Sequence, residues 1–79
     1  MRKPQVHHDL AQKYQEAFED LGLDIHDPAF TRWVEGGPHL KWSSEFNQEW
    51  GRFFDRFPTP TLRQVLDQFQ KMRNDPRFR

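Results

Sequence analysis

The histidines are the residues of this 79-residue chain best suited to chemistry, because the chain has no cysteine and no serine arrangement typical of nucleophilic catalysis. His7 and His8 are adjacent, and consecutive side chains in an extended segment point to opposite sides. One of the two can therefore bind a metal ion while the other faces a substrate. That division suits phosphodiester hydrolysis, in which a divalent metal polarises the phosphate and a neutral imidazole accepts a proton from water. The alternative is that the pair is solvated or is the remnant of a purification tag.

A further set of candidate metal donors follows the turn Gly36-Gly37-Pro38. His39 comes directly after this turn, shortly before a strongly amphipathic helix, and Asn47 lies one turn into that helix beside its apolar stripe. We expect the Asn47 amide oxygen to lean toward an ion held by His39. A set of imidazole and amide donors without a carboxylate suits Zn, Ni, Co or Mn, whereas Mg needs more water ligands. The alternative for Asn47 is a surface amide or one that hydrogen-bonds a nearby turn.

Other residues are candidates for contacts with a substrate or for support of the site. His26, between two aspartates, either caps a turn or bonds a neighbouring carboxylate, or else it contacts a substrate phosphate or supports a ligand from behind. Trp42 follows His39 closely and is predicted to line the substrate cleft. The predicted phosphate contacts are Lys41, Arg32 and Arg52.

Charge and composition set limits on this chemistry. Twelve basic residues balance twelve acidic ones, so the net charge does not favour a nucleic-acid partner. Residues 9–31 contain one basic and six acidic residues, whereas residues 32–79 contain nine basic and six acidic ones. With Arg2 and Lys3 before the histidine pair, the N-terminal arm and the C-terminal half are able to form a phosphate-binding face. The chain lacks the apolar runs of a signal peptide or a membrane span, although a carrier protein can still export it.

The length of the chain predicts a single domain over residues 1–79. Residues 4–8 are expected to be extended, and Asp9 is expected to cap a helix that ends at Gly22 in the left-handed conformation. Residues 23–25 are a candidate brief strand, and a single helical turn is expected after Asp27-Pro28. Residues 32–35 and 39–42 are predicted to pair as a two-stranded ribbon across the turn that joins them.

Two helices are predicted in the C-terminal half. The first is capped by Ser43 or Ser44, is stopped by Pro58, and carries an apolar stripe. The second is predicted to be capped by Thr59, with Pro60 at its first helical position, and to end at Asp75-Pro76. The fold class predicted is a helix-rich α+β domain with a small extended ribbon and three helices. The apolar stripe residues are Phe46, Trp50, Phe53, Phe54 and Phe57 in the first helix, and Leu62, Val65, Leu66, Phe69 and Met72 in the second.

Taken together, four segments resemble the double-histidine toxin nucleases of the HNH/endonuclease VII superfamily. They are the pair His7-His8, the segment Leu-Gly-Leu-Asp-Ile-His at 21–26, His39, and the segment Phe-Asn-Gln-Glu-Trp-Gly-Arg-Phe-Phe at 46–54. The similarity runs from about His7 to Met72. Such nucleases form the C-terminal tips of bacterial polymorphic toxins, including Rhs-type and type VI secretion effectors.

The resemblance implies a ββα-metal finger, in which a ribbon and a helix hold one divalent ion, Zn, Ni, Mn or Mg. Both residues of the pair would be catalytic, His7 as a metal ligand and His8 as the general base that activates water. His39 matches the histidine before the metal-binding helix, and Asn47 matches a position that is often a ligand on it. The sequence departs from the nuclease-colicin pattern at Ser43, where a second histidine would follow His39.

The function implied is a metal-dependent endonuclease that cuts DNA in preference to RNA. It would be secreted within a larger effector, delivered into the cytoplasm of a target bacterium and neutralised in the producer by an immunity protein. Two alternatives remain at the level of sequence. One is a toxin that cuts RNA with the same site. The other is a non-catalytic helical interaction domain that binds a partner through Trp33, Trp42 or Trp50, because aromatic residues are favoured interface anchors.

Overall fold

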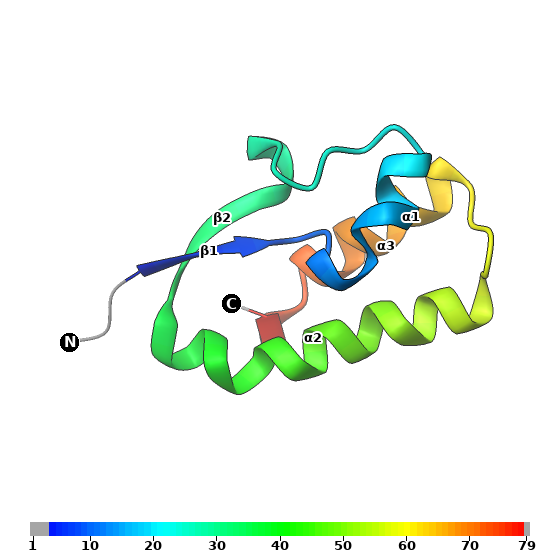
Figure 1. Ribbon diagram of the computed structural model, residues 1–79. Helices are drawn as coiled ribbons and strands as arrows, with labels where there is room; N and C mark the ends of the chain where they lie inside the picture. Colours follow the sequence, from blue (N-terminus) through cyan, green and yellow to red (C-terminus); the bar gives the residue numbers. More distant parts are fainter. Residues whose placement is uncertain (1–3, 79) are drawn as a thin grey trace.

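The computed structural model describes residues 4–78, which form a helix-rich α+β fold with three helices and a two-stranded antiparallel ribbon (Figure 1). The predicted fold class is therefore confirmed. No helix of this described part is long and apolar enough to cross a membrane. The elements in chain order are β1 (Pro4–His8), the 3-10 turn η1 (Gln12–Tyr14), α1 (Gln15–Asp20), η2 (Pro28–Phe30), β2 (Thr31–Glu35), α2 (Gly36–Arg56), α3 (Leu62–Arg73) and η3 (Pro76–Phe78).

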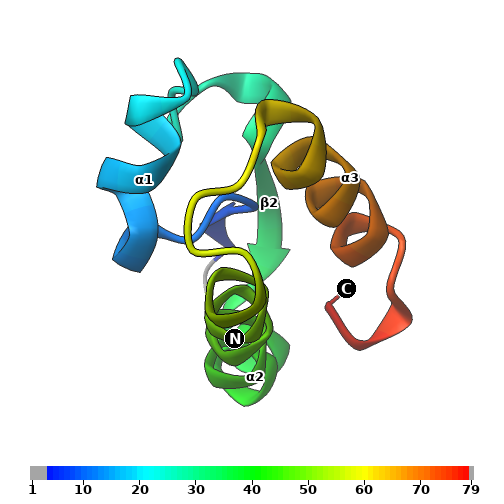
Figure 2. The same cartoon turned by 90° about the vertical axis from the view of Figure 1, so that its right-hand side faces the viewer.

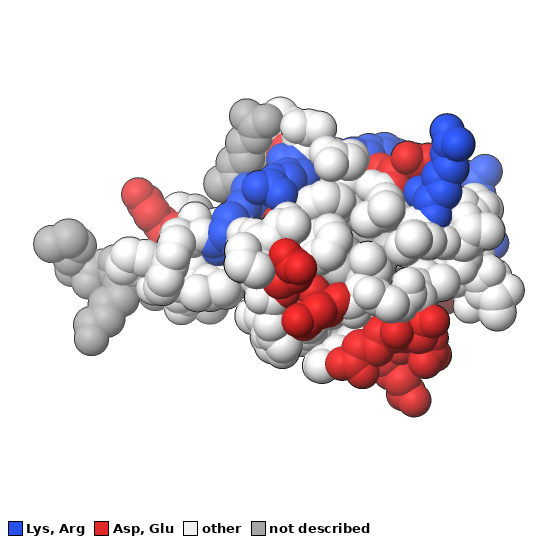
Figure 3. Space-filling model, turned by 90° about the horizontal axis from the view of Figure 1, so that it is seen from above, with Lys and Arg blue, Asp and Glu red and all other residues white. Residues whose placement is uncertain are grey.

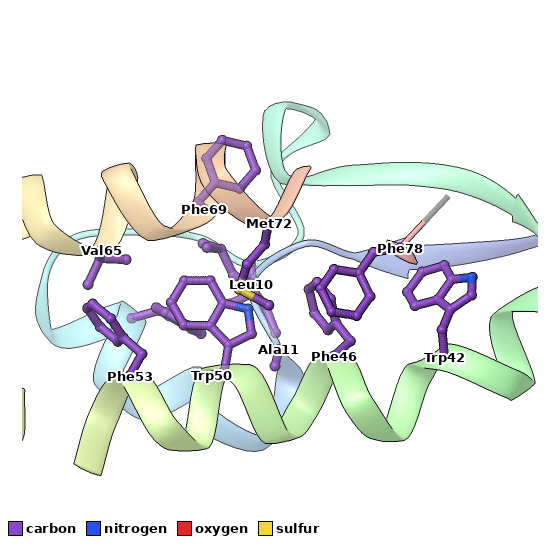
Figure 4. Close-up of a cluster of buried hydrophobic side chains, with 12 residues drawn as sticks. Leu10, Ala11, Trp42, Phe46, Trp50, Phe53, Val65, Phe69, Met72 and Phe78 are labelled. Carbon is purple, nitrogen blue, oxygen red and sulfur yellow. The ribbon is translucent and has the colours of Figure 1, made fainter. Parts of the chain in front are cut away.

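Helix α2 is the base on which the other elements pack. Viewed along its axis, α1 and α3 lie on opposite sides above it, and the ribbon lies between them (Figure 2). The buried face of α2 is the stripe Trp42, Phe46, Trp50 and Phe53, whose spacing of three and four residues places all four on one side of the helix (Figure 4). The rest of the buried core is Leu10, Ala11, Phe18, Ile25, Val65, Phe69, Met72 and Phe78.

The ribbon and the start of α2 differ from the sequence prediction. Strand β2 pairs with β1, and residues 39–42, its predicted partner, are the first turns of α2. Proline is compatible with a first helical turn, whose N–H groups have no partner within the helix, so Pro38 does not stop α2. An early start also places Trp42 one turn before Phe46 and extends the buried stripe. The ribbon is therefore followed directly by α2, but its strands are β1 and β2, which α1 separates in the chain.

Four local predictions can also be compared with the structure. Gly22 adopts a left-handed φ of 81°, as predicted for a residue that follows a helix. Asp9 does not cap a helix, because its carboxylate is buried and contacts Arg32. Residues 23–25 are not a strand, and Ile25 packs in the core. Helix α3 is capped by Thr61 and not by Thr59, because Gln64 lies three residues after Thr61 and completes a capping box.

Candidate functional site

Strand β1 and the first turn of α2 bring His7 and His39 together. The alternation of the strand turns His7 inward, where it is only 4% exposed. Its Nδ1 lies 3.2 Å from Nε2 of His39, and the two rings meet edge to face with centroids 5.1 Å apart. The ring of Trp42 packs against both imidazoles, with centroids 4.8 Å from each. The packing of Trp42 against both rings therefore holds the imidazoles so that one nitrogen of each faces the other.

The outer nitrogens of these two rings face oxygen atoms. His39 Nδ1 lies 2.9 Å from Gln5 Oε1, an amide oxygen that accepts a hydrogen bond. His7 Nε2 is buried without a hydrogen-bond partner in the described structure, and it lies 3.4 Å from Asp9 Oδ1. That contact is too long for a good hydrogen bond, but the negative charge still favours the proton on Nε2. With both outer nitrogens protonated, the inner lone pairs of His7 and His39 face each other.

Two facing lone pairs repel each other unless a proton or a cation lies between them. Two imidazole nitrogens bound to one tetrahedral zinc at about 2.0–2.1 Å would be separated by about 3.3–3.4 Å. The observed separation of 3.2 Å between His7 Nδ1 and His39 Nε2 is close to that value. Burial lowers the pKa of His39, and the nearby His7 and Arg32 lower it further, so this ring is neutral near pH 7, the form that binds metal. The histidine pair therefore fits two ligand positions of a divalent ion.

Further donors around this pair are neutral. Among residues 4–78 no group of three or more His, Cys, Asp or Glu side chains is arranged to hold a metal. Asn47 and Ser43 line the same pocket as His7 and His39, which has a volume of about 340 Å³. The other neutral donor side chains that line this pocket are the imidazole of His8, the amides of Gln12 and Asn47 and the hydroxyl of Ser43, and Asn47 as the third ligand stays a prediction.

His8 lies on the other side of β1 and forms a second histidine pair with His26. Gln12 Nε2 donates a hydrogen bond to His8 Nδ1 over 3.1 Å, which leaves the proton of this ring on Nε2. His8 Nε2 lies 3.1 Å from His26 Nδ1 and donates to it. Burial lowers the pKa of His8, with smaller contributions from His26 and His7 that exceed the opposing effect of Asp9. His8 is therefore neutral near pH 7 and lines the same pocket as the first pair.

His26 reaches His8 because the loop between α1 and η2 is fixed by local hydrogen bonds. The backbone N–H of His26 donates to Asp24 Oδ1 over 2.9 Å, and the backbone N–H of Ala29 donates to Asp27 Oδ1 over 2.8 Å. The neighbouring carboxylates thus bind the backbone, and the imidazole of His26 remains available to His8. The turn is capped by the Asp24 carboxylate and not by the His26 imidazole, which among the described residues contacts His8, so the supporting role of His26 stays a prediction.

The other predicted site residues lie outside the lining of the histidine pocket. Arg32, expected to contact phosphate, instead lies beside Asp9, with Nε 3.1 Å from Oδ1, and donates to the Phe78 carbonyl oxygen. Trp42, expected to line a cleft, is 7% exposed and packs on the two imidazoles. Lys41 is exposed and lies outside the lining of the histidine pocket. Arg52 is exposed and pairs with Glu49 at 3.0 Å. Arg2 and Lys3 lie outside the described residues.

Sequence reasoning missed three polar residues that position the histidines: Gln5, Asp9 and Gln12. Gln5 is two residues before His7 within β1, so the alternation of the strand places it on the side of His7. Asp9 is two residues after His7, directly beyond the end of β1, and its carboxylate also approaches His7. That signal is present in the sequence, but Asp9 also matches the pattern of a helix cap, which is the role predicted for it. Gln12 follows His8 by four residues, and its contact depends on the turn between them.

No family model, curated protein or solved structure that was compared with the chain matches it.

Proposed function

We propose that the chain is a metal-dependent endonuclease that hydrolyses phosphodiester bonds, with DNA as the preferred substrate. The observation that carries the proposal is that His7 Nδ1 and His39 Nε2 face each other 3.2 Å apart. The other ring nitrogen of His7 faces Asp9, and that of His39 faces Gln5. In metal sites, such oxygen partners accept the N–H of a ligating histidine and so hold its proton on the nitrogen that does not bind the metal. His7 and His39 would hold the ion, and Asn47 would supply a third donor from the same pocket.

In this proposal His8 is the general base. A bound divalent ion would supply positive charge that polarises the phosphate and stabilises the leaving oxygen. His8 accepts the proton of the attacking water on Nδ1, after the substrate displaces the exposed Gln12 amide from that nitrogen. His26 Nδ1 accepts the hydrogen bond of His8 Nε2, which orients the ring and the free lone pair. His26 is therefore a positioning residue for His8.

The biological setting proposed is that of an antibacterial toxin domain. Its support is the resemblance of the motif series to that of the double-histidine toxin nucleases, and the preference for DNA over RNA rests on the same resemblance. We propose that the domain is delivered into a target bacterium as part of a larger secreted effector, and that an immunity protein neutralises it in the producing cell. RNA cleavage by the same site is the alternative to DNA cleavage, and parallel digestion of plasmid and RNA distinguishes the two.

Metal binding tests the proposal directly. We expect isothermal titration with Zn or Ni to give one site per chain, and we expect His39→Ala to weaken that site by more than 100-fold, because a ligand contributes more than the 10–100-fold typical of its supporting groups. His26→Ala is the matched control, since it removes an imidazole that is not in the facing pair, and it should retain the site. Chelation should stop plasmid cleavage, and added divalent metal should restore it. Equal affinity in wild type and His39→Ala would contradict the assignment.

A second candidate function is a non-catalytic interaction domain. Trp33 is 73% exposed, and Val6, its partner across the ribbon, is 45% exposed, so the outer face of the ribbon carries an apolar surface. Exposed tryptophans are favoured anchors of protein interfaces. Trp42 and Trp50 are buried, so of the three tryptophans Trp33 is the one able to serve this role. Titrations in which neither Zn nor Ni binds above background would favour this function over the nuclease.

A further inference from the structure

The histidine pocket adjoins a larger hollow along α2. This hollow has a volume of about 720 Å³ and shares Lys13, Ser43 and Asn47 with the histidine pocket. We call the two together the α2 trough. It extends from His39 in the first turn of α2 to Asp55 in the last. At 1.5 Å per residue this stretch of helix is about 24 Å long.

The trough follows a face of α2 beside the buried stripe, and Phe46 of the stripe lines its histidine end. Its helical lining residues recur every three to four positions, so they form one continuous face toward η1. At Gly51 the two segments come close together, since a Cβ there would lie 2.9 Å from the Tyr14 hydroxyl. Because Gly51 has no side chain, the space between α2 and Tyr14 remains open at this position. The lining residues of the larger hollow on α2 are Ser43, Ser44, Asn47, Gln48, Gly51, Arg52 and Asp55.

The lining is suited to a polar, anionic chain. Four of the seven α2 residues that line the larger hollow carry a hydroxyl or an amide, and Lys13 and Arg52 provide two positive charges against the single acid Asp55 in this lining. Lys13 forms no salt bridge with any residue between 4 and 78, and it is exposed. Arg52 contacts Glu49 at 3.0 Å, but it is 60% exposed and free to exchange partners.

The neighbouring helix carries the opposite charge. Helix α1 begins directly after Tyr14, and its acidic residues Glu16, Glu19 and Asp20 are exposed. Figure 3 shows acidic side chains gathered over α1, at the lower right of the view. A duplex carries one negative charge per about 1.7 Å of its axis, twice the density of one strand. A duplex placed along the trough would bring its second backbone close to these carboxylates, whereas a single strand can stay within the trough.

We propose that the α2 trough binds single-stranded DNA on one side of the phosphate held at the histidines, with Lys13 and Arg52 contacting its backbone phosphates. This inference rests on the proposed nuclease function, whose substrate it narrows to unpaired strands. Lys13 lines both hollows, so it contacts the phosphate nearer to the histidines. Arg52, more than three helical turns beyond His39, contacts a phosphate farther along the strand.

Binding without cleavage tests the trough. The probe is a fluorescent single-stranded DNA of about 12 nucleotides, compared by anisotropy with a blunt duplex of the same sequence in the presence of EDTA. We expect tighter binding of the single strand. Lys13→Ala and Arg52→Ala should each weaken it about five- to tenfold and reduce the salt dependence of log K by about 0.7. Lys71→Ala, which removes an exposed cation from α3 outside the trough, should bind as wild type.

A substitution in the acidic helix α1 tests the proposal in the opposite direction, by strengthening the binding of duplex. Glu19→Gln removes one charge from α1 and should improve duplex binding more than single-strand binding. Equal losses in Lys13→Ala and Lys71→Ala, or tighter binding of duplex than of single strand by the wild type, would overturn the proposal. Failure of the trough and failure of the nuclease are distinguishable. If Lys13→Ala and Arg52→Ala bind the single strand normally and cleavage still depends on His8, only the proposed role of the trough is contradicted. If binding depends on Lys13 and Arg52 but no metal-dependent cleavage occurs, the nuclease function is contradicted.

Discussion

Replacing His8 with alanine is expected to lower the rate of plasmid cleavage by about 10²–10⁴-fold, the range typical for loss of a general base. The reason is that His8 is the neutral imidazole in the pocket whose Nδ1 can be freed by movement of one exposed side chain, that of Gln12. The fold should tolerate the change, because the side-chain partners of His8 are the exposed Gln12 and His26. The measurement is the rate of nicking of supercoiled plasmid with saturating metal, accompanied by thermal unfolding.

The His26 variants show whether His8 is oriented as proposed. His26→Ala should lower kcat with little change in KM, and by less than His8→Ala, because it removes only the acceptor of the His8 Nε2–H bond. His26→Gln retains an acceptor oxygen and should recover part of the lost rate. Plasmid nicking by His8→Ala at the wild-type rate would exclude His8 as the base. An unchanged kcat in His26→Ala would leave His8 as the base but remove the orienting role of His26.

The parts of the fold that the sequence predicted correctly are those set by local patterns. The stripe through Phe46, Trp50 and Phe53 repeats with the helical period, and this period depends on nothing outside the helix. The adjacent histidines were predicted to face opposite sides of an extended segment, and His7 and His8 do contact different partners. The alternation of a strand alone requires this.

The parts that the sequence did not predict depend on contacts between distant segments. Gly36-Gly37-Pro38 fits a hairpin turn as well as a helix start, and the choice depends on whether β2 pairs with residues 39–42 or with β1. Nothing in the local pattern of residues 4–8 identifies Thr31–Glu35 as their partner. Asp9 presents the same difficulty, because its carboxylate suits a helix cap until Arg32, distant in sequence, is placed beside it. The sequence predicted His7 and His39 as neighbours, but it did not predict the oxygen partners that set their tautomers.

Asp9 links the stability of the fold to the candidate metal site. Its carboxylate is 2% exposed, and Oδ1 lies 3.1 Å from Arg32 Nε and 3.4 Å from His7 Nε2. Asp9→Ala leaves the largely buried Arg32 guanidinium without its carboxylate, and we expect a loss of about 3 kcal/mol in the free energy of unfolding, the low end for a broken buried pair. A domain of this length is expected to have about 4–12 kcal/mol in total. Chemical denaturation measures the loss.

The matched control for this stability measurement is an ion pair on the surface. Asp67 and Arg63 lie 4.0 Å apart on α3 and are 76% and 92% exposed. Asp67→Ala should therefore cost at most about 0.5 kcal/mol, as expected for an exposed helical pair. Equal losses in Asp9→Ala and Asp67→Ala would contradict a buried pair at Asp9.

The orienting role of Asp9 toward His7 is separable from its structural role. Asp9→Asn keeps the size of the side chain but removes the charge that favours the His7 proton on Nε2, and zinc affinity should fall about 10–100-fold. Arg32→Ala also breaks the buried pair and should destabilise the fold, but it leaves the carboxylate beside His7, so zinc affinity should stay within a few-fold of wild type. Titration of both variants at a temperature where each is folded separates the two effects. If Asp9→Asn and Arg32→Ala lose zinc affinity equally, the lower affinity is a consequence of the destabilised fold, and Asp9 does not set the tautomer of His7.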